Sequence, residues 1–121
     1  MKTRGIRGAI TVTTDTKEEV LSATYELLDE IFTQNATLDK KDIASAFFTT
    51  TEDVLSAYPA LVTREMGWDF VPMLCAREIP VPDSLAMCIR VLIHWNTEKE
   101  QKEIKHIYLR DAKTLRPDLV D

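Results

Sequence analysis

The chain has 121 residues, the size of one domain, and its 45% hydrophobic and 29% charged residues are ordinary for a globular protein. Its net charge of −5 excludes the broad basic surface that nucleic acid or an acidic membrane would require. Cys75 and Cys88 form neither a CxxC pair nor a disulfide framework, and the N-terminal sequence MKTRGIRG has no apolar signal-peptide core. We therefore expect a single cytoplasmic domain spanning residues 1–121, without nucleic-acid or membrane partners.

Residues 2–13 alternate between apolar and polar or small side chains, which is the period of a strand. Ile6 and Ile10 fall on one face with Gly8, and Arg7 falls on the other. The glycines near Arg7 predict a close approach by another part of the structure. Taken alone, an edge strand with a solvated arginine remains the simpler interpretation of this stretch.

A helix is expected from about Thr16 to Gln34. Asp15 is the predicted N-cap, Glu18 completes a capping-box pattern, and Asn35 is the predicted stop. The helix has a broad apolar stripe and no evident chemistry. The predicted stripe consists of Val20, Leu21, Thr24, Tyr25, Leu27, Leu28, Ile31 and Phe32.

The middle of the chain predicts shorter elements. Residues 39–42 are a polar connection, and residues 43–50, IASAFFTT, have the composition of a strand. Pro59 fits the first position of a short helix that Gly67 closes. Residues 70–75 are expected to form another short strand.

The clearest predicted strand spans residues 86–95. Every second residue from Met87 to Trp95 is apolar, so this face must belong to the core. Arg90 lies in the opposite face. An ionised arginine among apolar neighbours is costly unless it meets an anion, and we interpret that anion as a substrate.

The C-terminal part begins with the charged residues 97–105, for which we expect a helical turn. A last strand around residues 106–110 places Tyr108 on the non-core face. The tail carries Arg116 before Pro117 and is expected to be extended.

Three predicted strands therefore carry Arg7, Arg90 and Tyr108 on their non-core faces. These faces are too apolar to be fully solvated. We expect them to meet another subunit or a ligand.

A resemblance to a known family covers nearly the whole chain and rests on five motifs in the same order. These motifs are RGIRGAITV at 4–12, CAREIPVP at 75–82, CIRV at 88–91, HIYL at 106–109 and LRPDL at 115–119. Together they resemble the monofunctional chorismate mutases of the trimeric α/β-barrel-like class. No single motif is specific, but the five in register are.

The resemblance implies an α+β fold of the chorismate mutase or ferredoxin-like type. A mixed five-stranded sheet would pack on one long helix, and a homotrimer would form a pseudo-α/β barrel with active sites between subunits. The implied reaction is the intramolecular Claisen rearrangement of chorismate to prephenate, toward phenylalanine and tyrosine. It needs no cofactor, metal or covalent intermediate, only conformational restriction and electrostatic stabilisation of the ether oxygen.

The resemblance also implies residue roles. Arg90 would reach the ether oxygen and a carboxylate, and Arg7 would bind a carboxylate. Glu78 would accept a hydrogen bond from the substrate hydroxyl and orient Arg90. The implied substrate-binding residues are Leu74, Cys75, Ala76, Arg77, Tyr108, Tyr58, Ala60, Arg64, Met73, Leu115 and Arg116. Leu61 stands where the family can carry a lysine at the pocket entrance, which leaves the charge there open.

Residue type alone gives simpler interpretations of several of these positions. Glu78 would be a surface residue, and Arg77 and Arg110 would be solvated. His94 and His106 lack metal-ligand spacing and are interpreted as structural.

Two other functions remain open from the residues themselves. One is a trimeric, non-catalytic small-anion-binding protein on the same scaffold, since a fold does not determine a function. The joint presence of Glu78 and Arg90 favours catalysis over simple anion binding. The other is a hydrolase or deaminase with Cys75 as nucleophile, for which no histidine is placed in the sequence as activating base.

Overall fold

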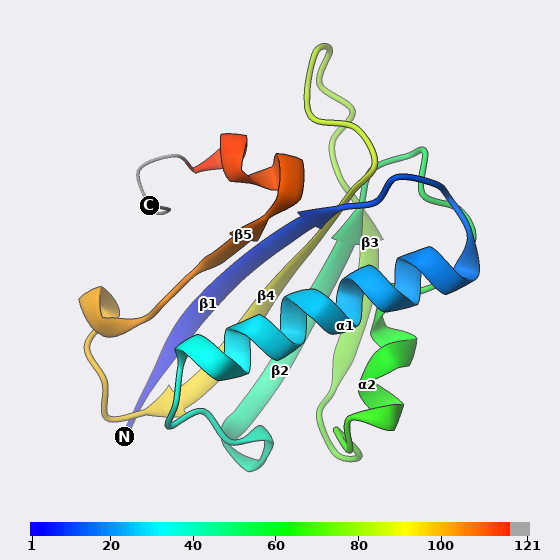
Figure 1. Ribbon diagram of the computed structural model, residues 1–121. Coiled ribbons are helices and arrows are strands. Elements are labelled where there is room, and N and C mark those ends of the chain that lie inside the picture. Colours follow the sequence, from blue (N-terminus) through cyan, green and yellow to red (C-terminus); the bar gives the residue numbers. More distant parts are fainter. Residues whose placement is uncertain (117–121) are drawn as a thin grey trace.

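The computed structural model describes residues 1–116, which form a five-stranded sheet with helix α1 across one face (Figure 1). The strands are β1 (Lys2–Thr11), β2 (Ile43–Thr50), β3 (Met73–Arg77), β4 (Cys88–Thr97) and β5 (Ile107–Leu109), and the helices are α1 (Lys17–Gln34) and α2 (Val62–Glu65). Short 3-10 helices occur at η1 (Lys40–Asp42), η2 (Pro59–Leu61), η3 (Gln101–Glu103) and η4 (Arg110–Leu115).

The sheet has the strand order β3-β2-β4-β1-β5. Strand β4 is antiparallel to both β1 and β2, whereas β5 is parallel to β1 and β3 is parallel to β2. This mixed sheet with one long helix confirms the predicted α+β fold.

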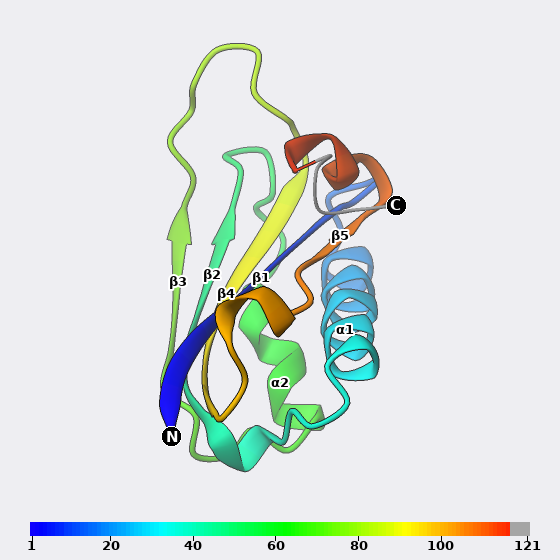
Figure 2. The same ribbon diagram turned by 90° about the vertical axis from the view of Figure 1, so that its left-hand side faces the viewer.

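The core lies between the sheet and the helices, which share one side of it (Figure 2). Ile6, Ile10 and Ile93 are fully buried there. A Cβ atom on Gly8 would lie 2.9 Å from Cδ1 of Ile31 on α1. The predicted close approach at the glycine is therefore made by the helix, and a larger residue would push α1 away from the sheet.

Helix α1 begins one residue later than its predicted cap. Thr16, not Asp15, is the N-cap, and its hydroxyl accepts a hydrogen bond from the Glu19 amide at 3.1 Å. Asp15 instead accepts from the amides of Leu55 and Ser56 at 3.0 Å, because this loop also has amides that need acceptors. Elsewhere in the helix, the predicted burial of Tyr25 was wrong, since its side chain is 49% exposed.

Two strands start later than the sequence predicted. Strand β3 begins at Met73 rather than Phe70, which is 97% exposed, because Pro72 has no N–H for a strand ladder. Strand β4 begins at Cys88 because Met87 has a φ of 52°, which interrupts the extended backbone. The carboxylate of Asp53 accepts the Met87 amide at 3.0 Å and holds this turn.

Two predictions in the C-terminal segment, at Leu115 and Arg110, were wrong, and residues 117–119 of the predicted tail lie outside the described residues. Leu115 ends the 3-10 helix η4 instead of lying in an extended tail, and Pro117 falls outside the described residues. Arg110 is not freely solvated. It adopts a φ of 56°, donates to the Thr11 carbonyl at 2.9 Å, and forms ion pairs with α1. These contacts turn the chain back over the sheet.

Within residues 1–116 no helix is long and apolar enough to cross a membrane. The same residues contain no group of three His, Cys, Asp or Glu side chains that could hold a metal ion.

Candidate active site

The sheet face opposite α1, called here the open face, carries a row of residues that runs across all five strands. Arg90 on β4 pairs with Ala9 on β1, and Ala9 pairs with Tyr108 on β5. On the other side Arg90 pairs with Thr49 on β2, which pairs with Ala76 on β3. Neighbouring strands lie about 4.8 Å apart, so Arg90 is at the centre of this row. The predicted common face of the strand residues is confirmed.

Arg90 is held beside a carboxylate. Its Nη1 lies 3.7 Å from Oε1 of Glu78, and their side chains are 22% and 26% exposed. The Arg90 Nε is buried and has no hydrogen-bond partner among the described residues. Because an unpaired buried donor is costly, this edge of the guanidinium is prepared to donate to a bound acceptor.

Tyr108 is more deeply buried than its predicted place on an accessible face implies. It is 2% exposed and packs with Ala9, Cys88 and Ala112, while Leu115 of η4 packs against this cluster. Burial raises the pKa of the Cys88 thiol. The Tyr108 hydroxyl is the second buried side-chain group without a partner within residues 1–116.

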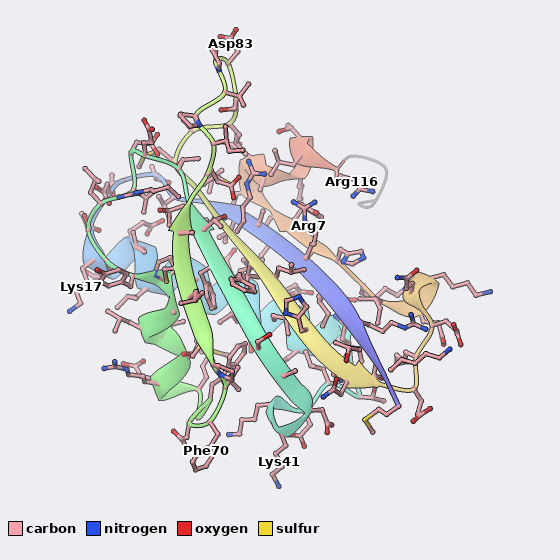
Figure 3. The ribbon with its side chains drawn as sticks, turned by 180° about the vertical axis from the view of Figure 1, so that it is seen from behind. Arg7, Lys17, Lys41, Phe70, Asp83 and Arg116 are labelled. Carbon is pink, nitrogen blue, oxygen red and sulfur yellow. The ribbon has the colours of Figure 1, made fainter. Side chains whose placement is uncertain are left out.

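Arg7 and Arg116 add positive charge beside this row (Figure 3). Arg7 is exposed on β1, and its backbone amide donates to Nδ1 of His106 at 3.0 Å. The pKa of His106 is lowered by burial first and then by the charges of Arg116 and Arg7. The open face of an acidic protein therefore concentrates arginines at one place, as binding of an anion requires.

We expect His106 to make the fold sensitive to acid. Its lowered pKa means that the unfolded chain binds this proton more readily than the folded chain below about pH 6.5. The free energy of unfolding should therefore fall as pH drops from 7 to 5.5. In His106→Asn, whose amide oxygen can accept from Arg7 without titrating, this decrease should be smaller. Urea unfolding at both pH values measures it.

A matched His94→Asn variant leaves His106 in place and should keep the wild-type decrease. If His106→Asn lost as much stability as wild type over this pH range, the lowered pKa would not matter for folding.

A second group of predicted residues lies at the β3 edge of the sheet. Six of them line one cavity of about 600 Å³, called here the edge pocket. They are Tyr58, Ala60, Arg64, Met73, Leu74 and Cys75. An adjoining cavity of about 420 Å³ is lined by Ala76 and Arg77, together with Lys17.

Arg77 is not simply solvated. Its Nη1 donates to the Thr50 hydroxyl at 2.8 Å and to the carbonyls of Thr51 and Val54 at 2.9 and 2.6 Å. The guanidinium therefore fixes the loop that leads to Tyr58. Arg77 also lines the second cavity, but the hydrogen bonds of its Nη1 hold this loop.

Tyr108 and the edge pocket cannot contact one substrate within one chain. Tyr108 lies on β5 and Cys75 on β3, the opposite edges of the sheet. Four strand spacings separate these edges by roughly 19 Å, too far for one small molecule to span. The structure thus brings the predicted residues together as two separate sets.

The geometry argues against Cys75 as an activated nucleophile. Cys75 pairs with the buried core residue Phe48 and so faces the helix side of the sheet. His94 bonds to Ser45 at 2.9 Å and His106 to Arg7, both on the open face. Neither histidine of the chain can serve Cys75 as a base within one subunit.

Sequence reasoning missed Thr49 and Lys17. Thr49 contacts Glu78, and Lys17 lines the smaller cavity at the β3 edge. The alternation of residues 43–50 could have placed Thr49 on the open face. Nothing in the sequence could have placed Lys17, because its proximity to β3 depends on how α1 crosses the sheet.

Comparison with known families gives a match over nearly the whole chain. Residues 3–119 match the family described as "Chorismate mutase type I".

Individual relatives and a solved structure agree with this match. The chain is 51% identical over 116 residues to "Chorismate mutase AroH" of Thermus thermophilus, covering 96% of this chain and 95% of the relative. It is 42% identical over 120 residues to "Chorismate mutase AroH" of Bacillus subtilis (strain 168), covering 98% and 94%. A solved chorismate mutase from Clostridium thermocellum superposes with a TM-score of 0.88 at 46% identity, over 91% of this chain and 97% of that chain.

Proposed function

This chain belongs to the chorismate mutase type I family and is a chorismate mutase, an isomerase of aromatic amino acid biosynthesis; from that premise we propose that Arg90, Glu78 and Arg7 are its catalytic residues. The observation that carries this assignment is the Arg90 guanidinium. Its Nη1 is paired with Glu78, its buried Nε has no hydrogen-bond partner among residues 1–116, and Arg90 lies in the same row as Tyr108.

The reaction asks for positioning and charge stabilisation. Chorismate is a flexible dianion, and its rearrangement breaks one C–O bond while a C–C bond forms, with no proton transfer. Arg7 and Tyr108 would bind carboxylates and favour the compact conformer. Arg90 would donate to the ether oxygen, on which negative charge grows as the C–O bond breaks. Glu78 would accept from the substrate hydroxyl and keep Arg90 in place.

We propose that the site is completed by a neighbouring subunit in a homotrimer. The open face of one chain would face the edge pocket of the next, so that both sets of residues contact one substrate. Two features support this. Tyr108 and the edge pocket lie at opposite edges of the sheet, and the open face exposes Phe47 (41%) and Leu74 (65%), which a subunit interface would cover. Leu115 and Arg116 would border the site from the C-terminal segment.

The remaining proposals follow from the family. Chorismate would be the substrate, a single chorismate mutase domain would span residues 1–121, and the protein would act in the cytoplasm without a cofactor. The alternative of a non-catalytic anion-binding protein is not favoured, because the matched relatives are named as chorismate mutases.

The test is the disappearance of chorismate absorbance on incubation with purified protein, with prephenate identified as the product. A heat-denatured sample is the control. Fast conversion by the native protein alone is the expected result. If chorismate bound without being converted, the anion-binding alternative would replace this proposal.

A further inference from the structure

We propose that Thr49 is a positioning residue for this reaction, which orients Glu78 and through it Arg90. The inference rests on the proposed function of the open face. Thr49 would not touch the substrate, and its effect would be transmitted by the carboxylate.

The two oxygens of the Glu78 carboxylate have different partners. The Thr49 hydroxyl donates a hydrogen bond to Oε2, while Oε1 lies 3.7 Å from Nη1 of Arg90. The hydroxyl therefore fixes the rotation of the carboxylate. With Oε2 engaged, Oε1 is directed toward the guanidinium.

The sheet places the three groups so that this arrangement forms. Thr49 is the cross-strand partner of Arg90, and Thr50 accepts the Glu78 amide at 2.9 Å through its carbonyl. That hydrogen bond anchors the backbone of Glu78 just beyond β3. Because Thr49 is β-branched and lies in a strand, it has few rotamers and presents its hydroxyl in a fixed direction.

The hydrogen bond is a stronger constraint than the ion pair. A carboxylate and a guanidinium 3.7 Å apart can adopt many relative orientations. Partly exposed ion pairs of this kind contribute little to stability by themselves. A hydroxyl bonded to a carboxylate is charge-assisted, directional and considerably stronger. Removal of the hydroxyl should therefore release Glu78, and Arg90 would lose its fixed partner.

The neighbouring residue Thr50 has a structural role, in contrast to the role proposed for Thr49. The Thr50 hydroxyl accepts from Arg77, which holds the loop toward Tyr58. The two adjacent threonines thus bind adjacent charged residues on opposite faces of the sheet, and only Thr49 contacts the Glu78–Arg90 pair.

The first experiment compares Thr49→Val, which keeps the shape but removes the hydroxyl, with Thr49→Ser, which keeps the hydroxyl. We expect kcat/KM for chorismate to fall about tenfold in Thr49→Val, as for loss of a hydrogen bond to a charged group. Thr49→Ser should recover most of the activity. Thr3→Val is the matched control. Thr3 on β1 donates to Asn96 on the adjacent strand β4 at 2.7 Å, and it lies roughly 20 Å along β1 from the site.

The second experiment asks whether the effect passes through Glu78. In a Glu78→Ala background, Thr49→Val should lower kcat/KM by less than about twofold, because residues that act on one another are not additive. An undiminished tenfold loss in this background would show that Thr49 acts independently of Glu78 and would overturn the inference. Thermal unfolding of each variant identifies any loss caused by misfolding.

The outcomes separate the inference from the function on which it rests. If wild type converts chorismate and Thr49→Val does so equally fast, the positioning role is wrong and the proposed function stands. Equal losses in Thr49→Val and Thr49→Ser would also overturn it, because shape rather than the hydroxyl would matter. If wild type has no mutase activity, the proposed function and this inference fall together.

Discussion

Arg90→Ala is expected to lower kcat/KM more than about a hundredfold, which corresponds to a loss of more than about 3 kcal/mol of transition-state stabilisation. A loss of this size is typical when a main donor to the transition-state oxygen is removed. The structure gives the physical reason. The guanidinium is largely buried beside Glu78, and its Nε has no hydrogen-bond partner in the part of the chain that the structure describes. A donor held in a site of low dielectric stabilises developing charge much better than water does. The measurement is steady-state conversion of chorismate by wild type and variant.

Two further variants make the Arg90 result specific. Arg90→Lys keeps the positive charge but loses the planar set of donors, so it should remain strongly impaired. Arg4→Ala removes an arginine that bonds to the Lys99 carbonyl and pairs with Glu100, at the far end of β1. It should be nearly normal. Near-normal turnover by Arg90→Ala would refute the electrostatic mechanism.

Mixing two inactive variants should restore activity if the site is shared between subunits. Arg90→Ala destroys the open-face half, whereas Tyr58→Asp places a carboxylate at the edge pocket and should repel the dianion. Tyr58 is 70% exposed, so this change should not prevent folding. In random mixed trimers, about a quarter of the sites would combine two intact halves. Activity should therefore rise from nearly none to about a quarter of the wild-type value after refolding together.

The control for this experiment uses two variants of the same half. Arg90→Ala mixed with Glu78→Ala should stay inactive, because every open face would lack one of the two residues. Recovery in this control, or no recovery in the mixture of Arg90→Ala with Tyr58→Asp, would contradict a site divided between the open face and the edge pocket. Sedimentation of the mixture would establish whether trimers formed.

The sequence predicted the faces of the strands better than their ends. Alternation in residues 2–13 and 86–95 placed Arg7 and Arg90 correctly, because a strand has a period of two whatever surrounds it. The ends depended on local details. Pro72 delays β3, and the positive φ of Met87, fixed by the distant Asp53, delays β4.

Other errors came from contacts between distant segments. Arg110 was expected to be solvated, but it pairs with Glu19 and Glu26, 91 and 84 positions away. Those pairs turn η4 over the sheet and help to bury Tyr108. The sequence pattern of the C-terminal segment could not predict these ion pairs, because they depend on how α1 and the chain after β5 are arranged in space.

The sequence by itself determined the α+β class, the shared non-core face of Arg7, Arg90 and Tyr108 and, through five motifs, the family. These depend on local periodicity and on residue identity. Only the tertiary structure decided that Tyr108 and the edge pocket lie at opposite edges of one sheet with Arg90 between them, and that Thr49 bonds to Glu78, 29 positions away. The physical reason is strand order. The sheet places β2 and β4 side by side and keeps β3 and β5 apart, and hydrogen bonding between distant strands, not the pattern within any one of them, sets that order.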